Sequence, residues 1–185
     1  MNIISIGTDR KIFDKTNPVH ERMKEYGTLF DELHIVIFSI KKHGYKNFQL
    51  SENVWVYPTN SSNKLLYIFD ALRIGKEIIR KNKVGIVTTQ DPFETGFVGL
   101  LLKKFKPICL NVQVHTDMYS PYFKKHSVLN RLRLAISFFV FRNADSIRVV
   151  SERIKKILIK RGIKEGSIRV LPIFVERHDY KNEEN

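Results

Sequence analysis

Polar segments follow four short runs rich in Ile and Val, and they contain the residue types best suited to chemistry. The segments hold Thr8, Asp9 and Arg10, then Gln90 and Asp91, then His115 and Asp117, and last Ser151. Carboxylate and amide oxygens accept hydrogen bonds from hydroxyl groups, and helix N-termini offer amide donors to anions. This set of residue types therefore favours a sugar or phosphate ligand over a lipid-like one.

His115 is the candidate catalytic residue of the set. At the tip of a strand, a neutral imidazole can donate to a hydroxyl or stabilise nearby charge near neutral pH. The alternative is a strand-terminal histidine whose ring is satisfied by the backbone. Asp117 could hold His115 or a substrate hydroxyl, although an aspartate just after a strand is more often a turn former.

The other segments each have a structural explanation beside the substrate-binding one. Asp9 and Arg10 can pair with one another or cap the loop that follows them. Asp91 is placed to cap a helix, and Ser151 is an N-cap first and a ligand second. Substrate binding by these residues is a hypothesis that the sequence alone does not decide.

The sequence lacks the motifs of several common kinds of site. Gly7 is followed by Thr8-Asp9-Arg10-Lys11, so neither the dinucleotide-binding glycine pattern nor the P-loop is present. No Cys and His set has zinc spacing, and the sequence shows neither a nucleophile elbow nor an acidic metal cage. We therefore expect no metal ion and no cofactor in this part of the molecule.

Size and charge narrow the class of protein. A chain of 185 residues is long enough for one buried α/β domain, and its hydrophobic content of 43% supports a packed core. Lys and Arg number 32 against 19 Asp and Glu, a net charge of +13 that indicates an anionic partner. Nucleic acid is the less favoured partner, because the sequence shows neither a recognition helix nor a sheet face of interleaved basic and aromatic residues.

The single cysteine and the lack of long apolar stretches bear on the compartment. Cys109 lies in the apolar run from Pro107 to Leu110, which predicts a small buried side chain and a reducing environment. No apolar stretch reaches the roughly 20 residues of a spanning helix, and the start of the sequence does not resemble a secretory leader. We expect a cytoplasmic protein whose membrane contact, if any, is peripheral.

A basic and apolar segment from 124 to 142 is the candidate for such contact. Lys124, Lys125, Arg131 and Arg142 lie there among leucines and phenylalanines. At about 100° per residue, Lys124, Arg131 and Arg142 share nearly one face of a helix. A helix lying on an anionic bilayer needs this pattern. An ordinary crossover helix, with its apolar side on a sheet, explains the segment equally well.

Strands are predicted at the runs rich in Ile and Val. These runs are residues 2–7, 33–39, 54–57, 85–89, 108–115, 146–150 and 168–171. Amphipathic segments lie between several of them, so we expect a Rossmann-like, doubly wound α/β fold with a mostly parallel sheet and helices on both faces. Ligands of such folds bind at the carboxyl ends of the strands, where the polar segments should meet.

Capping signals and composition place several boundaries. Asn17-Pro18, Asp91-Pro92-Phe93-Glu94 and Ser151 predict helix starts, and Gly162 predicts the end of the helix that follows Ser151. Residues 33–57 lack a helical pattern between their two strands, which leaves a hairpin-like or irregular excursion. We expect residues 1–175 to form the domain and the polar residues 176–185 to be a tail or the start of a linker.

Several parts of the sequence resemble glycosyltransferase family 4. The resemblance is carried by Val87 to Pro92, by Val114-His115-Thr116-Asp117, and by Ala144 to Glu152 with Ile163 to Pro172. It implies one half of a GT-B enzyme, which transfers a sugar from a nucleotide donor to an acceptor with retention, in a cleft between two Rossmann-like domains. It also implies that His115 faces the transferred sugar.

The same resemblance implies what this chain lacks. The family's nucleotide-contacting residues lie in a carboxyl-terminal domain that is expected to be missing here. We therefore expect an acceptor-side domain, inactive alone, that works with a missing donor-binding domain or a separate subunit on a nucleotide sugar and a glycan or lipid-linked acceptor. Many relatives dock on the inner membrane through basic helices, which favours the membrane interpretation of residues 124–142. The alternative is a non-catalytic basic module that binds an anionic membrane or nucleic acid.

Overall fold

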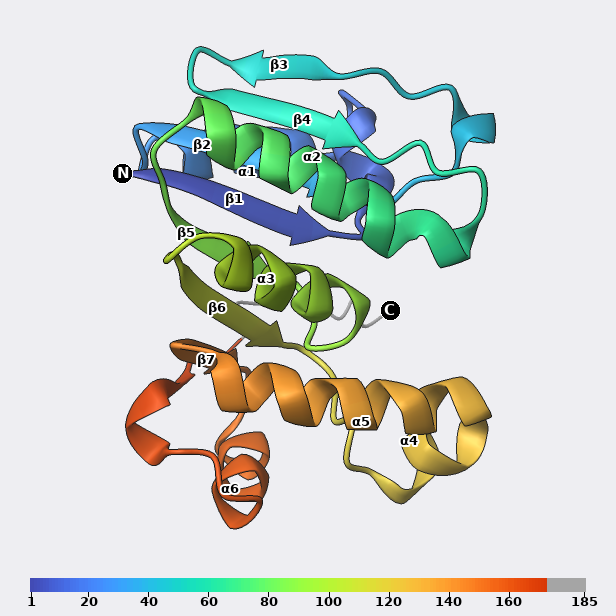
Figure 1. Ribbon diagram of the computed structural model, residues 1–185, viewed down its shortest axis with the longest axis vertical. Helices are drawn as coiled ribbons and strands as arrows, with labels where there is room; N and C mark the ends of the chain where they lie inside the picture. Colours follow the sequence, from blue (N-terminus) through green and yellow to red (C-terminus); the bar gives the residue numbers. More distant parts are fainter. Residues whose placement is uncertain (173–185) are drawn as a thin grey trace, which may run out of the picture.

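A computed structural model of the chain describes residues 1–172, which form one eight-stranded sheet (Figure 1). The strands are β1 (Asn2–Gly7), β2 (Glu32–Ile37), β3 (Phe48–Ser51), β4 (Val54–Pro58), β5 (Val84–Thr89), β6 (Cys109–Val114), β7 (Ser146–Val149) and β8 (Ile168–Val170). Their order is β3-β4-β2-β1-β5-β6-β7-β8, and all neighbours are parallel except β3 and β4. The expected mostly parallel α/β fold is confirmed, whereas the predicted tail 176–185 lies outside the described residues.

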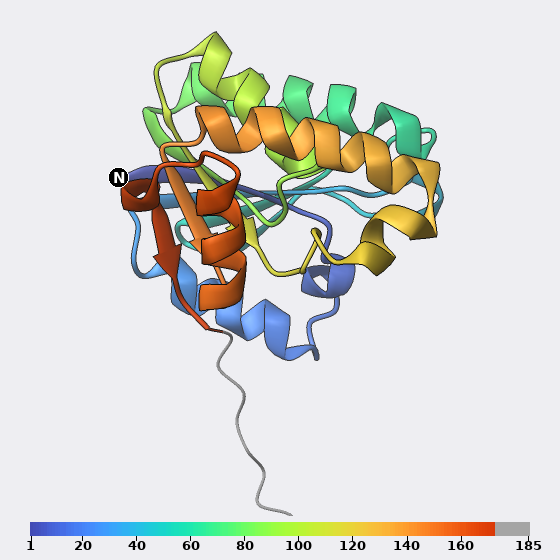
Figure 2. The same cartoon turned by 90° about the horizontal axis from the view of Figure 1, so that it is seen from below.

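Helices lie on both faces of this sheet. The helices are α1 (Pro18–Gly27), α2 (Tyr67–Lys81), α3 (Glu94–Phe105), α4 (Pro121–His126), α5 (Val128–Asn143) and α6 (Glu152–Lys160), with 3-10 turns η1 (Arg10–Phe13), η2 (Lys41–His43), η3 (Lys64–Leu66) and η4 (Glu165–Ser167). Figure 2 shows α1 on one face and α2, α3 and α5 on the other. The chain crosses from β1 to β2 in one direction and from β5 to β7 in the other, so right-handed crossovers place α1 opposite α3 and α5.

Two apolar clusters hold these layers together. Ile4, Ile6, Val87, Leu110 and Ile147 project from the sheet into a cluster that also contains apolar residues of α2, α3, α5 and α6. On the other face, residues of β1, β2 and β4 meet apolar side chains of η1 and α1. Successive side chains of a strand point to opposite faces, so a single strand such as β1 supplies both clusters.

The face that carries α1 has two unlike parts. Under α1 and η1, the side chains from β1, β2 and β4 are apolar and buried. Farther along the same face, β5, β6 and β7 present polar and partly exposed side chains: Thr88, Asn111, Gln113, Ser146 and Arg148. Within residues 1–172, helices therefore cover this second face over only part of its width.

Several helix boundaries match the capping signals. Asn17 caps α1 by accepting a hydrogen bond from the backbone N–H of Val19 at 3.1 Å, with Pro18 as the first helical residue. Ser151 caps α6 through the backbone N–H of Ile154 at 3.4 Å. Gly162 follows α6 with a φ of +83°, a left-handed conformation that favours glycine and ends the helix.

The segment from 124 to 142 is not one helix, which corrects the expectation of a single basic face. Ser127 has extended backbone angles, φ −164° and ψ 158°, and separates α4 from α5. Its hydroxyl accepts a hydrogen bond from the backbone N–H of Asn130 at 3.1 Å and so starts α5. Lys124 belongs to α4, whereas Arg131 and Arg142 belong to α5, so the three basic residues are not part of one helix.

Two smaller expectations are corrected, and one alternative is decided. The helix after β5 starts at Glu94 rather than Pro92, and Glu94 forms an ion pair with Arg133 at 2.8 Å rather than closing a capping box. Cys109 is exposed, because the alternation along β6 turns it away from the buried Leu110. The excursion between β2 and β4 is the hairpin-like alternative, because it contains β3, an antiparallel edge strand that pairs with β4.

Candidate functional site

The four polar segments predicted from the sequence meet at one edge of the sheet. β1, β5, β6 and β7 are adjacent and parallel, so the loops that follow them leave the sheet side by side (Figure 1). The segments are those that begin at Thr8, Gln90, His115 and Ser151. The topology thus brings together residues that are up to 143 positions apart in the chain, from Thr8 to Ser151.

The loop after β1 is tied to the loop after β5. The side-chain oxygen of Gln90 accepts a hydrogen bond from the backbone N–H of Thr8 at 3.1 Å, and a Cβ atom at Gly7 would lie only 2.3 Å from the Gln90 side chain. Gly7 is therefore needed because it lets Gln90 cross the end of β1. Gln90 organises the edge and keeps its amide N–H₂ group for other contacts.

Asp9 and Arg10 have different surroundings. The Asp9 carboxylate accepts a hydrogen bond from the backbone N–H of Lys11 at 3.1 Å and caps η1, which is the capping role anticipated for it. Arg10 is exposed and is not paired with Asp9. Arg10 and Thr8 are the more accessible polar groups of this loop.

Asp91 has a structural role at the start of α3. Its carboxylate accepts a hydrogen bond from the backbone N–H of Phe93 at 2.8 Å, and its carbonyl accepts one from the Thr95 hydroxyl at 3.1 Å. Burial raises the pKa of Asp91, although the hydrogen bond from the backbone N–H of Phe93 opposes the shift. The side chain is thus engaged within its own turn.

His115 lies just beyond the end of β6 and is exposed. Its Nε2 atom is 3.0 Å from the side-chain oxygen of Gln113. Partial desolvation and the positive charge of Arg148 lower the pKa of His115, which favours the neutral ring near pH 7. The ring of His115 is therefore held by the side chain of Gln113 and not by a backbone group.

Asp117 is oriented by an ion pair rather than by His115. Its Oδ2 atom lies 2.8 Å from Nη1 of Arg153 at the start of α6, whereas its buried Oδ1 atom has no hydrogen-bond partner among the described residues. Ser151, two residues before Arg153, is engaged as the N-cap of α6. The loop after β6 and the start of α6 are thereby linked across the edge.

Two residues near His115 were not predicted from the sequence as part of the site. Gln113 and Arg148 are neighbours across β6 and β7, and both lie on the polar face. The signal for Gln113 was its position two residues before His115, which places both side chains on one face of the strand. Within residues 1–172, no group of three or more His, Cys, Asp or Glu side chains is placed to hold a metal ion.

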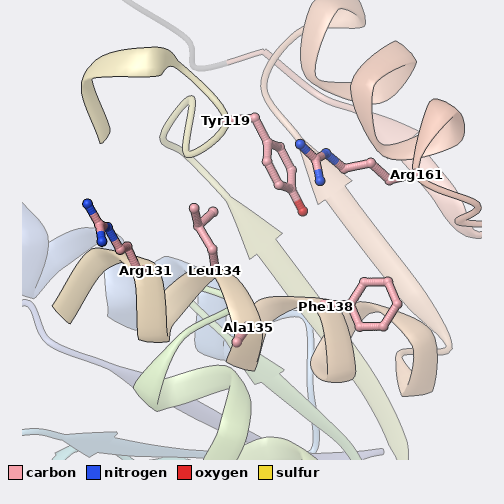
Figure 3. Close-up of a pocket in the computed structure, with 6 residues that line it drawn as sticks. All are labelled: Tyr119, Arg131, Leu134, Ala135, Phe138 and Arg161. Carbon is pink, nitrogen blue, oxygen red and sulfur yellow. The ribbon is translucent and has the colours of Figure 1, made fainter. Parts of the chain in front are cut away.

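A separate pocket of about 340 Å³ opens between α5, the end of α6 and the loop after β6. It is lined by Tyr119, Arg131, Leu134, Ala135, Phe138 and Arg161, and Figure 3 shows the two arginines on opposite sides of it. The Arg161 guanidinium stacks 4.0 Å from the Tyr119 ring centre. Among the described residues, no carboxylate lines this pocket, which is therefore cationic with an apolar floor.

The exposed side of α4 and α5 combines apolar and basic residues. Tyr122, Val128 and Leu132 have 85%, 79% and 57% of their surface exposed, and Lys125 and Arg131 are exposed beside them. Arg142 stacks over Phe138 at 4.7 Å farther along α5. None of the helices in residues 1–172 has both the length and the apolar character needed to span a bilayer.

Comparison with protein families decides the family. The model of Glycosyltransferase Family 4 matches residues 23–178, which is most of the chain. The chain belongs to glycosyltransferase family 4. No individual protein of curated function matches its sequence significantly. The matched range includes β5, β6 and β7, so three of the four strands that carry the candidate site lie within the family 4 domain.

Solved structures place this family 4 domain as one half of a GT-B fold. A sucrose-phosphate synthase structure from Thermosynechococcus elongatus matches with a TM-score of 0.70 at 15% identity, covering 95% of this chain and 91% of that one. A lipopolysaccharide outer core galactosyltransferase matches with a TM-score of 0.58 at 13% identity, over 95% of this chain and 46% of that one.

A third match is UDP-GlcNAc 2-epimerase from Neisseria meningitidis, solved with UDP-GlcNAc bound, with a TM-score of 0.61 at 12% identity. The match covers 92% of this chain and 46% of the epimerase chain. The family 4 chain thus spans less than half the length of several proteins that it resembles. At these identities the likeness establishes the fold, and the fold is half of GT-B.

Proposed function

We propose that the chain is the acceptor-side domain of a retaining glycosyltransferase, which transfers a sugar from a nucleotide donor to a glycan or lipid-linked acceptor. The observation that carries the proposal is the meeting of the four polar strand ends in a chain of family 4. Hydroxyl-rich ligands suit this edge, since His115, Gln90, Thr8 and Arg10 offer both donors and acceptors there. Asp117, Asp9, Asp91 and Ser151 shape the loops that surround them.

His115 is the residue we propose to contact the transferred sugar. It is exposed at the edge, its ring is held by Gln113, and its lowered pKa keeps it neutral at physiological pH. A neutral ring can make a directional hydrogen bond to a hydroxyl without attracting a counter-ion. Asp117 and Arg153 keep the loop in place beside the ring.

We further propose that the donor site needs a second domain, in a longer form of the protein or in a separate chain. Half of a GT-B fold offers one wall of the cleft between two domains. Several fold relatives were solved with UDP or a UDP-sugar bound, for example the Neisseria epimerase, which makes a nucleotide sugar the donor to test first. The chain is proposed to work in the cytoplasm, where nucleotide sugars are available.

The direct test is hydrolysis and transfer with a panel of nucleotide sugars. The chain alone should show no turnover, and addition of the donor-binding domain should produce it. The His115→Ala variant should then lose about tenfold or more in rate, the cost expected for a lost hydrogen bond in a partly desolvated site. His43→Ala is the matched control, because His43 is an exposed histidine of η2. Turnover by the chain alone would overturn the need for a donor domain.

A second function, contact with an anionic bilayer, is favoured by the exposed side of α4 and α5. Large apolar side chains normally avoid water unless they meet a partner, and here they alternate with Lys125 and Arg131. The cationic pocket, which Arg131 also lines, suits a lipid phosphate. Arg142, which is exposed on the same helix as Arg131, would extend the basic surface along α5.

Co-sedimentation with vesicles tests this contact. Binding to vesicles of phosphatidylglycerol should exceed binding to phosphatidylcholine and should fall with salt. Arg131→Glu with Lys125→Glu should reduce it, whereas the control Lys46→Glu, an exposed residue between η2 and β3, should not. Equal binding to both vesicle types, or tighter binding to DNA than to anionic vesicles, would contradict a membrane role.

A further inference from the structure

The polar side chains of β5, β6 and β7 form a connected hydrogen-bond ladder. Gln113 donates through Nε2 to the Thr88 hydroxyl at 3.3 Å, and that hydroxyl donates to Asn111 Oδ1 at 3.0 Å. Asn111 in turn donates through Nδ2 to the Ser146 hydroxyl at 3.1 Å. Each donor in this ladder meets an acceptor on the neighbouring side chain, so the direction of the hydrogen bonds is consistent from β5 to β7.

Arg148 fixes the orientation of the Gln113 amide at the top of this ladder. A guanidinium can only donate, and Nη1 of Arg148 lies 3.5 Å from Oε1 of Gln113. If the amide were rotated by half a turn, its N–H₂ group would face the guanidinium and two sets of donors would oppose one another. The distance is long for a hydrogen bond, so the charge of Arg148 does most of the orienting.

The same Gln113 oxygen faces the ring of His115. Nε2 of His115 is 3.0 Å from Oε1, an atom that can only accept. A short contact of this kind requires that Nε2 carry the proton. In a neutral imidazole the other nitrogen, Nδ1, is then an acceptor.

We propose that Gln113 and Arg148 are positioning residues that hold His115 as its Nε2–H tautomer, so that the neutral ring presents Nδ1 to the ligand as a hydrogen-bond acceptor. The inference rests on the proposed function for the ligand, since it assumes that His115 contacts the sugar. It adds that the matching ligand group is a donor, such as a sugar hydroxyl, rather than a carbonyl or phosphate oxygen. The neutral ring has no second N–H to donate, so this inference replaces the expectation that His115 donates to a hydroxyl with one in which it accepts from a hydroxyl.

The charges around the ring are compatible with this state. Arg148 on β7 disfavours a second proton on the ring, and partial burial acts in the same direction. Asp117, in the same loop, is already paired with Arg153 of α6 at 2.8 Å. The carboxylate that would favour an imidazolium is therefore engaged elsewhere.

Nitrogen-15 NMR of the ligand-free chain tests the proposal without any activity. Long-range correlations separate protonated from unprotonated ring nitrogens, and His115→Gln identifies the signals of this ring. Above its pKa, His115 should show Nε2–H with a proton that exchanges slowly with water. In Gln113→Leu that protection should disappear. In Gln113→Glu the pKa of His115 should rise by about one pH unit or more, because a carboxylate then faces Nε2.

Variants of Arg148 and Arg169 show whether the state of His115 depends on Arg148 in particular or on any positive charge on this face. Arg148→Met should raise the pKa of His115 and weaken the protection of its Nε2–H, whereas Arg169→Met on β8 is the matched control and should change neither. Backbone spectra show whether each variant is folded. A ring protonated on Nδ1, or a Gln113→Leu variant with unchanged tautomer and exchange rate, would overturn the proposal. Unchanged sugar transfer by His115→Ala with the donor-binding domain present, while wild-type His115 shows the Nε2–H state, would instead count against the proposed function.

Discussion

The sheet face that carries α1 has an apolar part under α1 and η1 and a polar part on β5, β6 and β7. The strands have the same geometry in both parts, but the two parts have different roles. Under α1 and η1, Ile3, Ile35 and Val54 are buried in an apolar cluster. On β5 to β7, the equivalent positions hold polar side chains that bond to one another and end at His115. The first part stabilises the sheet by removing apolar surface from water. The second keeps side chains in defined orientations beside an exposed edge, which is what a binding site requires.

Truncation of a side chain in the apolar part should give the largest effect. Ile35 is 2% exposed and belongs to the cluster under α1. Ile35→Ala should lower the free energy of unfolding by about 2–5 kcal/mol, because transfer free energy is lost and a cavity remains. Urea denaturation followed by circular dichroism measures the change. Ile35→Val, expected to cost about 0.5–1.5 kcal/mol, shows whether the loss scales with the methyl groups removed.

A substitution in the polar part should cost much less. Asn111→Val removes the hydrogen bonds to Thr88 and Ser146, each worth about 1 kcal/mol at most in a partly exposed setting, and adds a residue that favours strands. We expect the free energy of unfolding of this variant to lie within about 1 kcal/mol of the wild-type value. The same denaturation series gives the value. A loss as large as that of Ile35→Ala would mean that this face is buried in solution, and the contrast between the two parts would fail.

The strands were predictable because the two parts leave different patterns in the sequence. β2 reads as an almost continuous apolar run, Leu33 to Ile37 broken only by His34, as expected for a parallel strand buried on both faces. β6 and β7 alternate strictly, as expected for strands with one open face. Cys109 was predicted to be buried because its neighbours are apolar, yet the alternation of β6 places it on the open face.

Other elements could not be predicted from local patterns. β3 is short and polar at Gln49 and Ser51, and it exists only because β4 offers an edge to pair with. The break at Ser127 was hidden because basic residues lie on both sides of it, Lys125 before and Arg131 after, and one N-cap serine is a weak signal within such a segment.

The candidate site was predictable in position and not in its contacts. Parallel strands must end at the same edge, so Thr8, Gln90, His115 and Ser151 could be grouped from the sequence. The partners of His115 could not, because Gln113 and Arg148 look like ordinary solvent-facing residues of alternating strands until β6 and β7 are paired. The ion pair of Asp117 with Arg153 likewise depends on how α6 packs beside the loop.

The smallest effects are expected in the pH dependence of stability, to which His34 and His115 both contribute. His34 is 3% exposed on β2, between Tyr57 at 3.2 Å and Glu32 at 3.4 Å, and its pKa is lowered because desolvation outweighs the attraction of Glu32. With a lowered pKa in the folded state, the unfolded chain binds more protons between that value and the usual value of about 6.5. Stability should therefore fall as the pH drops below about 6.5, at no more than about 1.4 kcal/mol per pH unit for one proton.

Replacing each histidine in turn separates their contributions. His34→Gln removes the titrating group, so the slope of unfolding free energy against pH between about 7 and 5 should become shallower than in the wild type. His115 has a lowered pKa with the same sign, but it is exposed, so His115→Gln should flatten the slope less. Urea denaturation at several pH values gives both slopes. A larger effect from His115 than from His34 would mean that the edge of the sheet is more tightly packed in solution than the contrast between the two parts requires.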